Sequence, residues 1–138
     1  MSFPKRRPAP DPNQPEHGLV VRSHRNLGTL LARLEEGELA VIDRRDLDAS
    51  VARALLARKP AAVLNAADFI SGRYANLGPR LLAAGGVTLL EGSREQVLGL
   101  RDGQRLHRQG ASLLDGAVVA VDVREVTAEE IEQRMDTA

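Results

Sequence analysis

The apolar positions of this chain form two alternating patterns: short continuous runs, and residues at helical spacing. The continuous runs have the length and composition of buried strands, and they are Leu19–Val21, Leu39–Asp43, Ala61–Asn65 and Val87–Leu90. Between these runs, apolar residues recur three and four positions apart, which predicts helices over about 27–36, 47–58 and 77–85. Strands that alternate with helices in this way favour parallel pairing through right-handed crossovers.

Polar residues, prolines and glycines mark the expected ends of these helices. Asn26 suits the start of the first helix, and Asp46 or Asp48 suits the start of the second. The expected ends are Gly37, Pro60 and the pair Gly85-Gly86.

The pattern changes after residue 100. Two turn pairs, Asp102-Gly103 and Gln109-Gly110, separate short segments that predict hairpin strands around Leu106, Leu113-Leu114 and Val118–Val123. We therefore expect an α/β fold with a small parallel-sheet core, flanking helices and a C-terminal β-hairpin region.

Three segments are expected along the chain. Residues 1–18 hold five of the seven prolines and predict a disordered tail, because such a stretch buries too little apolar surface to offset its ordering. Residues 19–126 form the α/β domain. Thr127 and Glu130 then form a capping box that begins a last helix, and we interpret 127–138 as the start of a linker to downstream domains absent from this chain.

The composition excludes several classes of function. The absence of cysteine removes disulfides and thiolate sites, and the low aromatic content with a net charge of +0 argues against nucleic-acid binding. The amino terminus lacks the apolar segment of a signal peptide, and no apolar run approaches the ~20 residues of a membrane span. We therefore expect a cytoplasmic domain without direct membrane contact.

The loop Asn65–Pro79 is the strongest candidate for a functional site. It follows a predicted parallel strand and opens a helix, so it lies at the sheet edge where ligands bind in open α/β folds. Glycines there allow close backbone approach, arginine supplies a forked cation, and hydroxyls supply donors. The candidate ligand- or partner-binding residues are Asn65, Ser71, Gly72, Arg73, Tyr74, Asn76 and Gly78.

The same loop also has a purely structural interpretation. Its glycines can make the turn, Asn76 can cap the next helix with Pro79 in the first turn, and Arg73 can be solvated. The sequence matches neither a P-loop nor the G-x-G-x-x-G fingerprint.

No other constellation predicts catalysis or metal binding. Asp43, Asp46 and Asp48 could supply oxygen ligands to Mg²⁺, but two of them equally suit the first turn of a helix, which we favour. The three histidines, His17, His24 and His107, are scattered without metal-ligand spacing, and no serine lies in a G-x-S-x-G turn. We assign no catalytic residue, metal or cofactor.

Several motifs of the chain resemble the opening domain of SteA-like proteins. The resemblance covers roughly residues 22–135, and its most specific segment is Ile70–Pro79. The other matching segments are Gly37–Asp43, Asp46–Asp48, Val63–Ala67, Ala83–Val87 and Leu100–Gly103. Full-length members of that bacterial family continue into a thiamin-pyrophosphokinase-like domain and a membrane anchor at the cytoplasmic face. They are associated with the cytokinetic ring and act with a membrane partner in cell-wall hydrolysis and cell separation.

The resemblance implies a non-enzymatic amino-terminal domain that mediates assembly or binds a protein of the division machinery. The alternative is an accessory domain of a thiamin-pyrophosphokinase-like enzyme that binds a phosphate or nucleotide ligand, with Asn65, Ser71, Arg73 and Asn76 contacting the anion. A third expectation is a homo-oligomer formed through the C-terminal helix, whose apolar positions need cover.

A weaker resemblance concerns shape. The order of elements is similar to the swivelling β/β/α phosphohistidine domain, which carries a phosphoryl group on a loop histidine. No histidine lies between His24 and His107, so we do not expect phosphotransfer.

Overall fold

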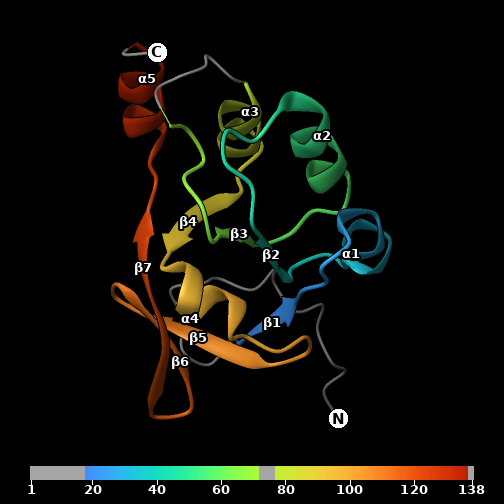
Figure 1. The fold of residues 1–138 in the computed structure, drawn as a ribbon, viewed down its shortest axis with the longest axis vertical. Coiled ribbons are helices and arrows are strands. Elements are labelled where there is room, and N and C mark those ends of the chain that lie inside the picture. Colours follow the sequence, from blue (N-terminus) through green and yellow to red (C-terminus); the bar gives the residue numbers. More distant parts are fainter. Residues whose placement is uncertain (1–17, 72–76, 137–138) are drawn as a thin grey trace, which may run out of the picture.

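Seven strands form one closed barrel in the computed structural model, which describes residues 18–71 and 77–136 (Figure 1). Their order around the barrel is β1-β2-β3-β4-β7-β6-β5. The strands are β1 (Leu19–Arg22), β2 (Leu39–Ile42), β3 (Ala62–Asn65), β4 (Thr88–Gly92), β5 (Arg105–Gln109), β6 (Ser112–Asp115) and β7 (Val118–Glu125). The helices are α1 (Leu27–Arg33), α2 (Ala49–Ala57), α3 (Gly78–Ala84), α4 (Arg94–Leu98) and α5 (Ala128–Asp136).

The parallel half of the barrel follows the sequence pattern. Strands β1 to β4 are parallel neighbours, with a helix after each of the first three. The Asn26 side chain accepts a hydrogen bond from the Thr29 N–H at the start of α1, and the Asp48 side chain accepts one from Val51 at the start of α2. These two predicted caps are confirmed.

The expected small parallel-sheet core with flanking helices and a C-terminal β-hairpin region, similar to the swivelling β/β/α phosphohistidine domain, is wrong, because the strands form a closed mixed barrel. Strand β7 pairs antiparallel with β4, and β5 pairs antiparallel with β1, so the hairpin strands close the sheet. Strands β2 and β3 are buried along their whole length. Helices cover one face of these strands, and the hairpin strands enclose the other.

Two apolar clusters fill the two sides of the parallel strands. The outer cluster lies under the helices α1, α2, α3 and α5 and includes Ile42, Val63 and Leu89. The inner cluster fills the barrel and includes Val41, Leu64 and Leu90 together with residues of the hairpin strands. Adjacent residues of one strand therefore point into different cores, as the alternation of a β-strand requires.

Helix α4 was not predicted. It follows β4 directly and contributes Val97 to the inner cluster, so it covers one end of the barrel (Figure 1). Ser93 caps this helix by accepting a hydrogen bond from the Gln96 N–H at 3.3 Å. The Ser-x-x-Gln spacing of Ser93 and Gln96 is a capping-box signal in the sequence that could have revealed the helix.

Helix α5 is attached to the barrel by a buried carboxylate. Glu91 of β4 receives hydrogen bonds from the Arg134 guanidinium of α5, from Arg124 of β7 and from the Phe69 N–H. The apolar side of α5 packs into the outer cluster, where Ile131 is 1% exposed. The apolar position that motivated the oligomer prediction is therefore covered by the chain's own core.

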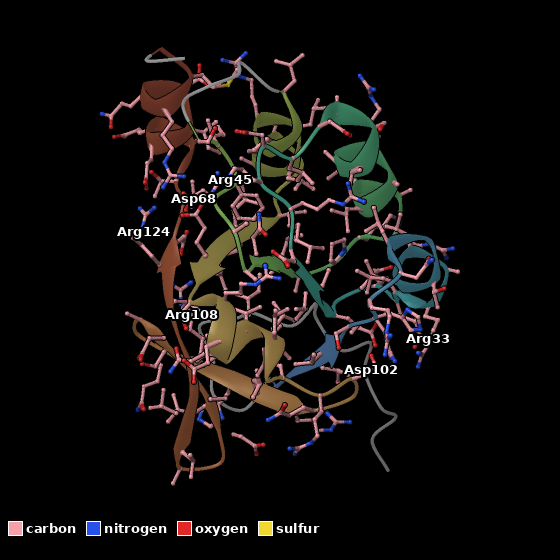
Figure 2. The ribbon with its side chains drawn as sticks, in the orientation of Figure 1. Arg33, Arg45, Asp68, Asp102, Arg108 and Arg124 are labelled. Carbon is pink, nitrogen blue, oxygen red and sulfur yellow. The ribbon has the colours of Figure 1, made fainter. Side chains whose placement is uncertain are left out.

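A second charged network joins β1 to its two neighbours. The Arg22 guanidinium makes a bidentate pair with the Glu38 carboxylate at 3.0 and 2.6 Å, and it also contacts Asp102 at 3.2 Å. Arg33 of α1 reaches the same Asp102 carboxylate at 2.8 Å (Figure 2). Glu38 directly precedes β2 and Asp102 lies just before β5, so the network spans the seam where the barrel closes.

The network sets the ionisation of its two carboxyl groups. Burial opposes ionisation of Glu38, but hydrogen bonds from Arg22 and from the Glu35 N–H outweigh it and lower the pKa of Glu38. Burial also opposes ionisation of Asp102, but the Ser23 N–H and the charges of Arg22 and Arg33 lower its pKa. Both groups are therefore stabilised as carboxylates in the folded chain.

We predict that acidification destabilises the domain through this network. A carboxyl group with a lowered folded pKa contributes its full stabilisation above its unfolded pKa of about 4 and loses it as the pH falls through the folded value. The urea midpoint should therefore fall between pH 5 and pH 3. Glu38→Gln should lower the midpoint at pH 7 and make its decrease on acidification shallower. Equal acid sensitivity of the two proteins would contradict a role for Glu38.

Gly78 marks a close approach between α3 and the loop that precedes α2. A Cβ atom at this position would lie 2.1 Å from the Leu47 carbonyl oxygen and 2.7 Å from the Asp48 carbonyl oxygen. Both oxygens belong to the backbone and cannot move aside as a flexible side chain could. The predicted site residue Gly78 is therefore required for packing.

Gly78→Ala should lower the free energy of unfolding by about 2 kcal/mol or more, because overpacking of this kind typically costs 1–3 kcal/mol. Gly99→Ala is the matched control, since its nearest atoms would lie 3.4 Å from the new Cβ atom. Urea denaturation of both variants tests the prediction, and equal midpoints would refute it.

Candidate functional site

A cleft of about 690 Å³ opens where β1 and β2 end. Its charged and polar lining comes from the segments that directly follow these two strands, and helix α4 borders it. We call it the basic cleft, and its polar residues are Ser23, His24, Arg25, Asp43, Arg44 and Arg45. The carboxyl ends of parallel strands are a common position for ligand sites in α/β proteins, and the basic cleft occupies that position.

The basic cleft carries unbalanced positive charge. Arg25, Arg44 and Arg45 are exposed, and no carboxylate in the described part of the chain forms an ion pair with any of them. Asp68 lies at the same end of the barrel as Arg45 (Figure 2), but no ion pair joins the two side chains. Among the described lining residues, the single carboxylate is Asp43, and the Arg94 guanidinium of α4 pairs with it.

The imidazole of His24 is fixed by a local hydrogen bond. Its Nδ1 accepts from the Asn26 N–H at 3.0 Å. An accepting Nδ1 carries no proton, so this contact assigns the ring hydrogen to Nε2. His24 can therefore donate to a ligand, while its acceptor nitrogen is occupied by the backbone.

Asn65 positions the backbone of Arg44. The Asn65 side chain is fully buried; its oxygen accepts from the Arg44 N–H and the Ala67 N–H at 3.0 Å, and its amide donates to the Arg44 carbonyl at 2.7 Å. These contacts engage both polar ends of the side chain. Asn65 was predicted to contact a ligand, and the structure instead places it beneath the loop that carries one of the cleft arginines.

Ser71, at the end of the described part of the β3–α3 loop, binds Asp46 of the β2–α2 loop. Its N–H donates to one Asp46 carboxylate oxygen and its hydroxyl donates to the other, both at 2.7 Å. Backbone hydrogen bonds from Asp46 to Asp68 and from Leu47 to Phe69 join the same two loops. Asp46 adopts a φ of 55°, a left-handed conformation that aspartate tolerates better than most residues. The β2–α2 and β3–α3 loops therefore form one connected layer at the edge of the barrel.

The three clustered aspartates all have protein partners. Asp43 pairs with Arg94, Asp46 binds Ser71, and Asp48 caps α2. Hydrogen bonds from the Val51 N–H and from the Ser50 hydroxyl lower the pKa of Asp48. In residues 18–71 and 77–136, no group of three or more His, Asp or Glu side chains has a geometry that could hold a metal ion.

The structure brings together a different set of residues from the one that was predicted. Gly72, Arg73, Tyr74 and Asn76 lie outside the described residues. Asn65, Ser71 and Gly78 serve the local architecture, whereas Arg25, Arg44 and Arg45 were missed. The signal for the last two was present, because an Arg-Arg pair follows the apolar run Leu39–Asp43 directly at the predicted strand end.

Asn65→Ala should lower the free energy of unfolding by about 2–3 kcal/mol. The change leaves the Arg44 and Ala67 backbone groups without their partner, and each unsatisfied buried group costs about 1–3 kcal/mol, with the partial exposure of these groups reducing the sum. Ser50→Ala is the control, since its exposed hydrogen bond to Asp48 should contribute within about 0.5 kcal/mol. Chemical denaturation measures both, and a loss below 1 kcal/mol for Asn65→Ala would count against the positioning role.

Comparison of the chain with protein-family models, with curated proteins and with solved structures gives no match. The resemblance to SteA-like proteins therefore rests on the sequence motifs. No helix within residues 18–71 and 77–136 has the length and hydropathy needed to cross a membrane.

Proposed function

We propose that this chain is the non-enzymatic amino-terminal domain of a SteA-like bacterial cell-division protein, and that it serves assembly or partner binding. The observation that carries the proposal is the basic cleft, which is lined by three exposed arginines at the ends of two parallel strands, none of them in an ion pair with a carboxylate of the described residues. The cleft is the contact for an anionic group in this proposal. The family named in the proposal rests on the resemblance of the sequence motifs to SteA-like proteins.

Arginine is suited to such a role. Its planar guanidinium binds carboxylate and phosphate oxygens in pairs and stays charged at every physiological pH. A hydrogen bond to a charged group contributes about 1.5–3 kcal/mol, so two or three of them give about 3–9 kcal/mol before the entropic cost of association is subtracted. Binding of this size is expected to be weak and transient.

The polar set of the basic cleft favours binding over catalysis. Acid–base chemistry needs a side chain free to accept a proton, within reach of a nucleophile. The accepting nitrogen of His24 is engaged by Asn26, and the Asp43 carboxylate is paired with Arg94. The remaining charged groups are guanidinium groups, which bind anions but do not exchange protons near neutral pH.

A second candidate function is an accessory domain that binds a phosphate or nucleotide ligand for a thiamin-pyrophosphokinase-like enzyme. The volume of the cleft favours it, since about 690 Å³ lies within the range of about 300–1,000 Å³ found for small-molecule sites. The two functions share the same chemistry of recognition and differ in the source of the anion.

Titration of the full chain with inorganic pyrophosphate and with a tetraglutamate peptide, followed by calorimetry, tests the proposal. We expect Arg45→Ala to weaken binding about tenfold, because it removes one charge-assisted contact, and added salt to weaken it further. Arg105→Ala is the matched control, since Arg105 is exposed on β5 and does not line the cleft. Tighter binding of the peptide supports the partner role, and tighter binding of pyrophosphate supports the accessory role. If neither anion binds, or if both variants bind equally well, the basic cleft is not an anion site.

A further inference from the structure

The basic cleft contains exposed apolar surface beside its arginines. Leu98, the last residue of α4, is 51% exposed and lines the cleft. Leu27, the first residue of α1, lines it as well and is half-buried. Val41 of β2 and Leu100 are buried lining residues. Two different helices therefore contribute accessible leucine side chains to one hollow.

Leu98 does not pack into either apolar core cluster. Val97, the residue before it, packs inside the barrel, whereas Leu98 belongs to neither apolar cluster. The free energy falls when an apolar group displaces water from such a surface. A hollow of about 690 Å³ holds roughly 20 water molecules at about 30 Å³ each, so there is room for a side chain as well as a charged group.

The charged groups lie at the surface of the molecule. His24, Arg25, Arg44 and Arg45 are all exposed. Small-molecule sites normally enclose most of their ligand and place a few polar groups inside, which this cleft does not do. A hollow that is lined by both apolar side chains and exposed arginines is instead typical of a protein–protein contact, in which arginine is enriched and a buried apolar residue acts as anchor.

We propose that the occupant of the basic cleft is an acidic peptide segment of a partner protein, with one apolar side chain beside its carboxylates. The apolar side chain lies against Leu98 and Leu27, and the carboxylates face Arg25, Arg44 and Arg45. The inference deepens the proposed function, because it rests on anion binding at this cleft and names the chemistry of the partner. The positive charge of the arginines favours an acidic segment, and the exposed Leu98 side chain favours an apolar residue within that segment.

The pairing of Asp43 with Arg94 fits the same occupant. An unpaired Asp43 carboxylate in the cleft would repel an acidic peptide, and the Arg94 guanidinium neutralises it from the side of α4. This ion pair belongs to the same helix that presents Leu98. Helix α4 therefore contributes both the apolar contact and the charge that removes the repulsion.

Two peptides of equal charge separate the apolar contribution from the electrostatic one. The peptides are acetylated and amidated Glu-Glu-Leu-Glu-Glu and Glu-Glu-Ser-Glu-Glu, and hexyl phosphate represents a small organic phosphate with an apolar body. Calorimetry with the full chain should show about tenfold tighter binding of the leucine peptide than of the serine peptide, as expected for burial of one leucine side chain.

Leu98→Ser should abolish this preference while leaving the affinity for the serine peptide unchanged. Val119→Ser is the matched control, because Val119 is 47% exposed on β7 and does not line the cleft, so it should keep the preference. Thermal unfolding of both variants verifies that the substitutions leave the fold intact, as expected for exposed positions.

The remaining outcomes are distinct. Equal binding of the two peptides, lost in Arg45→Ala, would overturn the apolar anchor and leave the proposed anion site standing. Tighter binding of hexyl phosphate than of the leucine peptide would overturn the peptide in favour of a small organic phosphate. No binding by any of the three probes would overturn this inference together with the proposed function.

Discussion

The central strands β2 and β3 bury apolar side chains on both of their faces, and the rest of the architecture depends on covering them. The helices α1, α2, α3 and α5 cover the outer face. The inner face needs a second layer, and the hairpin strands supply it by continuing the sheet until β5 meets β1. Helix α4 places the Val97 side chain in the inner cluster, at one end of the barrel. Closure also leaves no exposed sheet edge in the described barrel, which removes a common route to aggregation.

Because both faces are covered, the candidate site lies at the ends of the strands. The loops after β2 and β3 are joined to each other by Asn65, by the contact between Asp46 and Ser71, and by backbone hydrogen bonds. Asn65 and Ser71, which the sequence predicted to be ligand contacts, make hydrogen bonds between these two loops instead. Arg44 and Arg45 remain exposed beside this connected layer, and both line the basic cleft.

The sequence predicted elements well and their assembly poorly. Local signals such as the Asn26 and Asp48 caps were sufficient for α1 and α2, because a cap acts within one turn of its helix. Closure depends on the pairing of Leu19 with Leu106, residues far apart in the chain, and no local pattern encodes which strand a hairpin joins. The site failed for a related reason. Asn65 and Ser71 have the donors and acceptors of ligand-binding residues, but residue type does not state whether the partner is a ligand or the neighbouring loop.

The net charge of +0 concealed the most informative electrostatic feature. Elsewhere in the described structure, carboxylates are shared between arginines: Asp102 contacts Arg22 and Arg33, and Glu91 contacts Arg124 and Arg134. These pairs lie at the barrel seam and under α5, where they hold elements together. Within the described residues, Arg25, Arg44 and Arg45 form no ion pair that joins two elements, although the charge of Arg44 helps to lower the pKa of Asp48. These arginines lie at an edge that also exposes Leu98, and the proposed anionic partner rests on where the charges lie rather than on their sum.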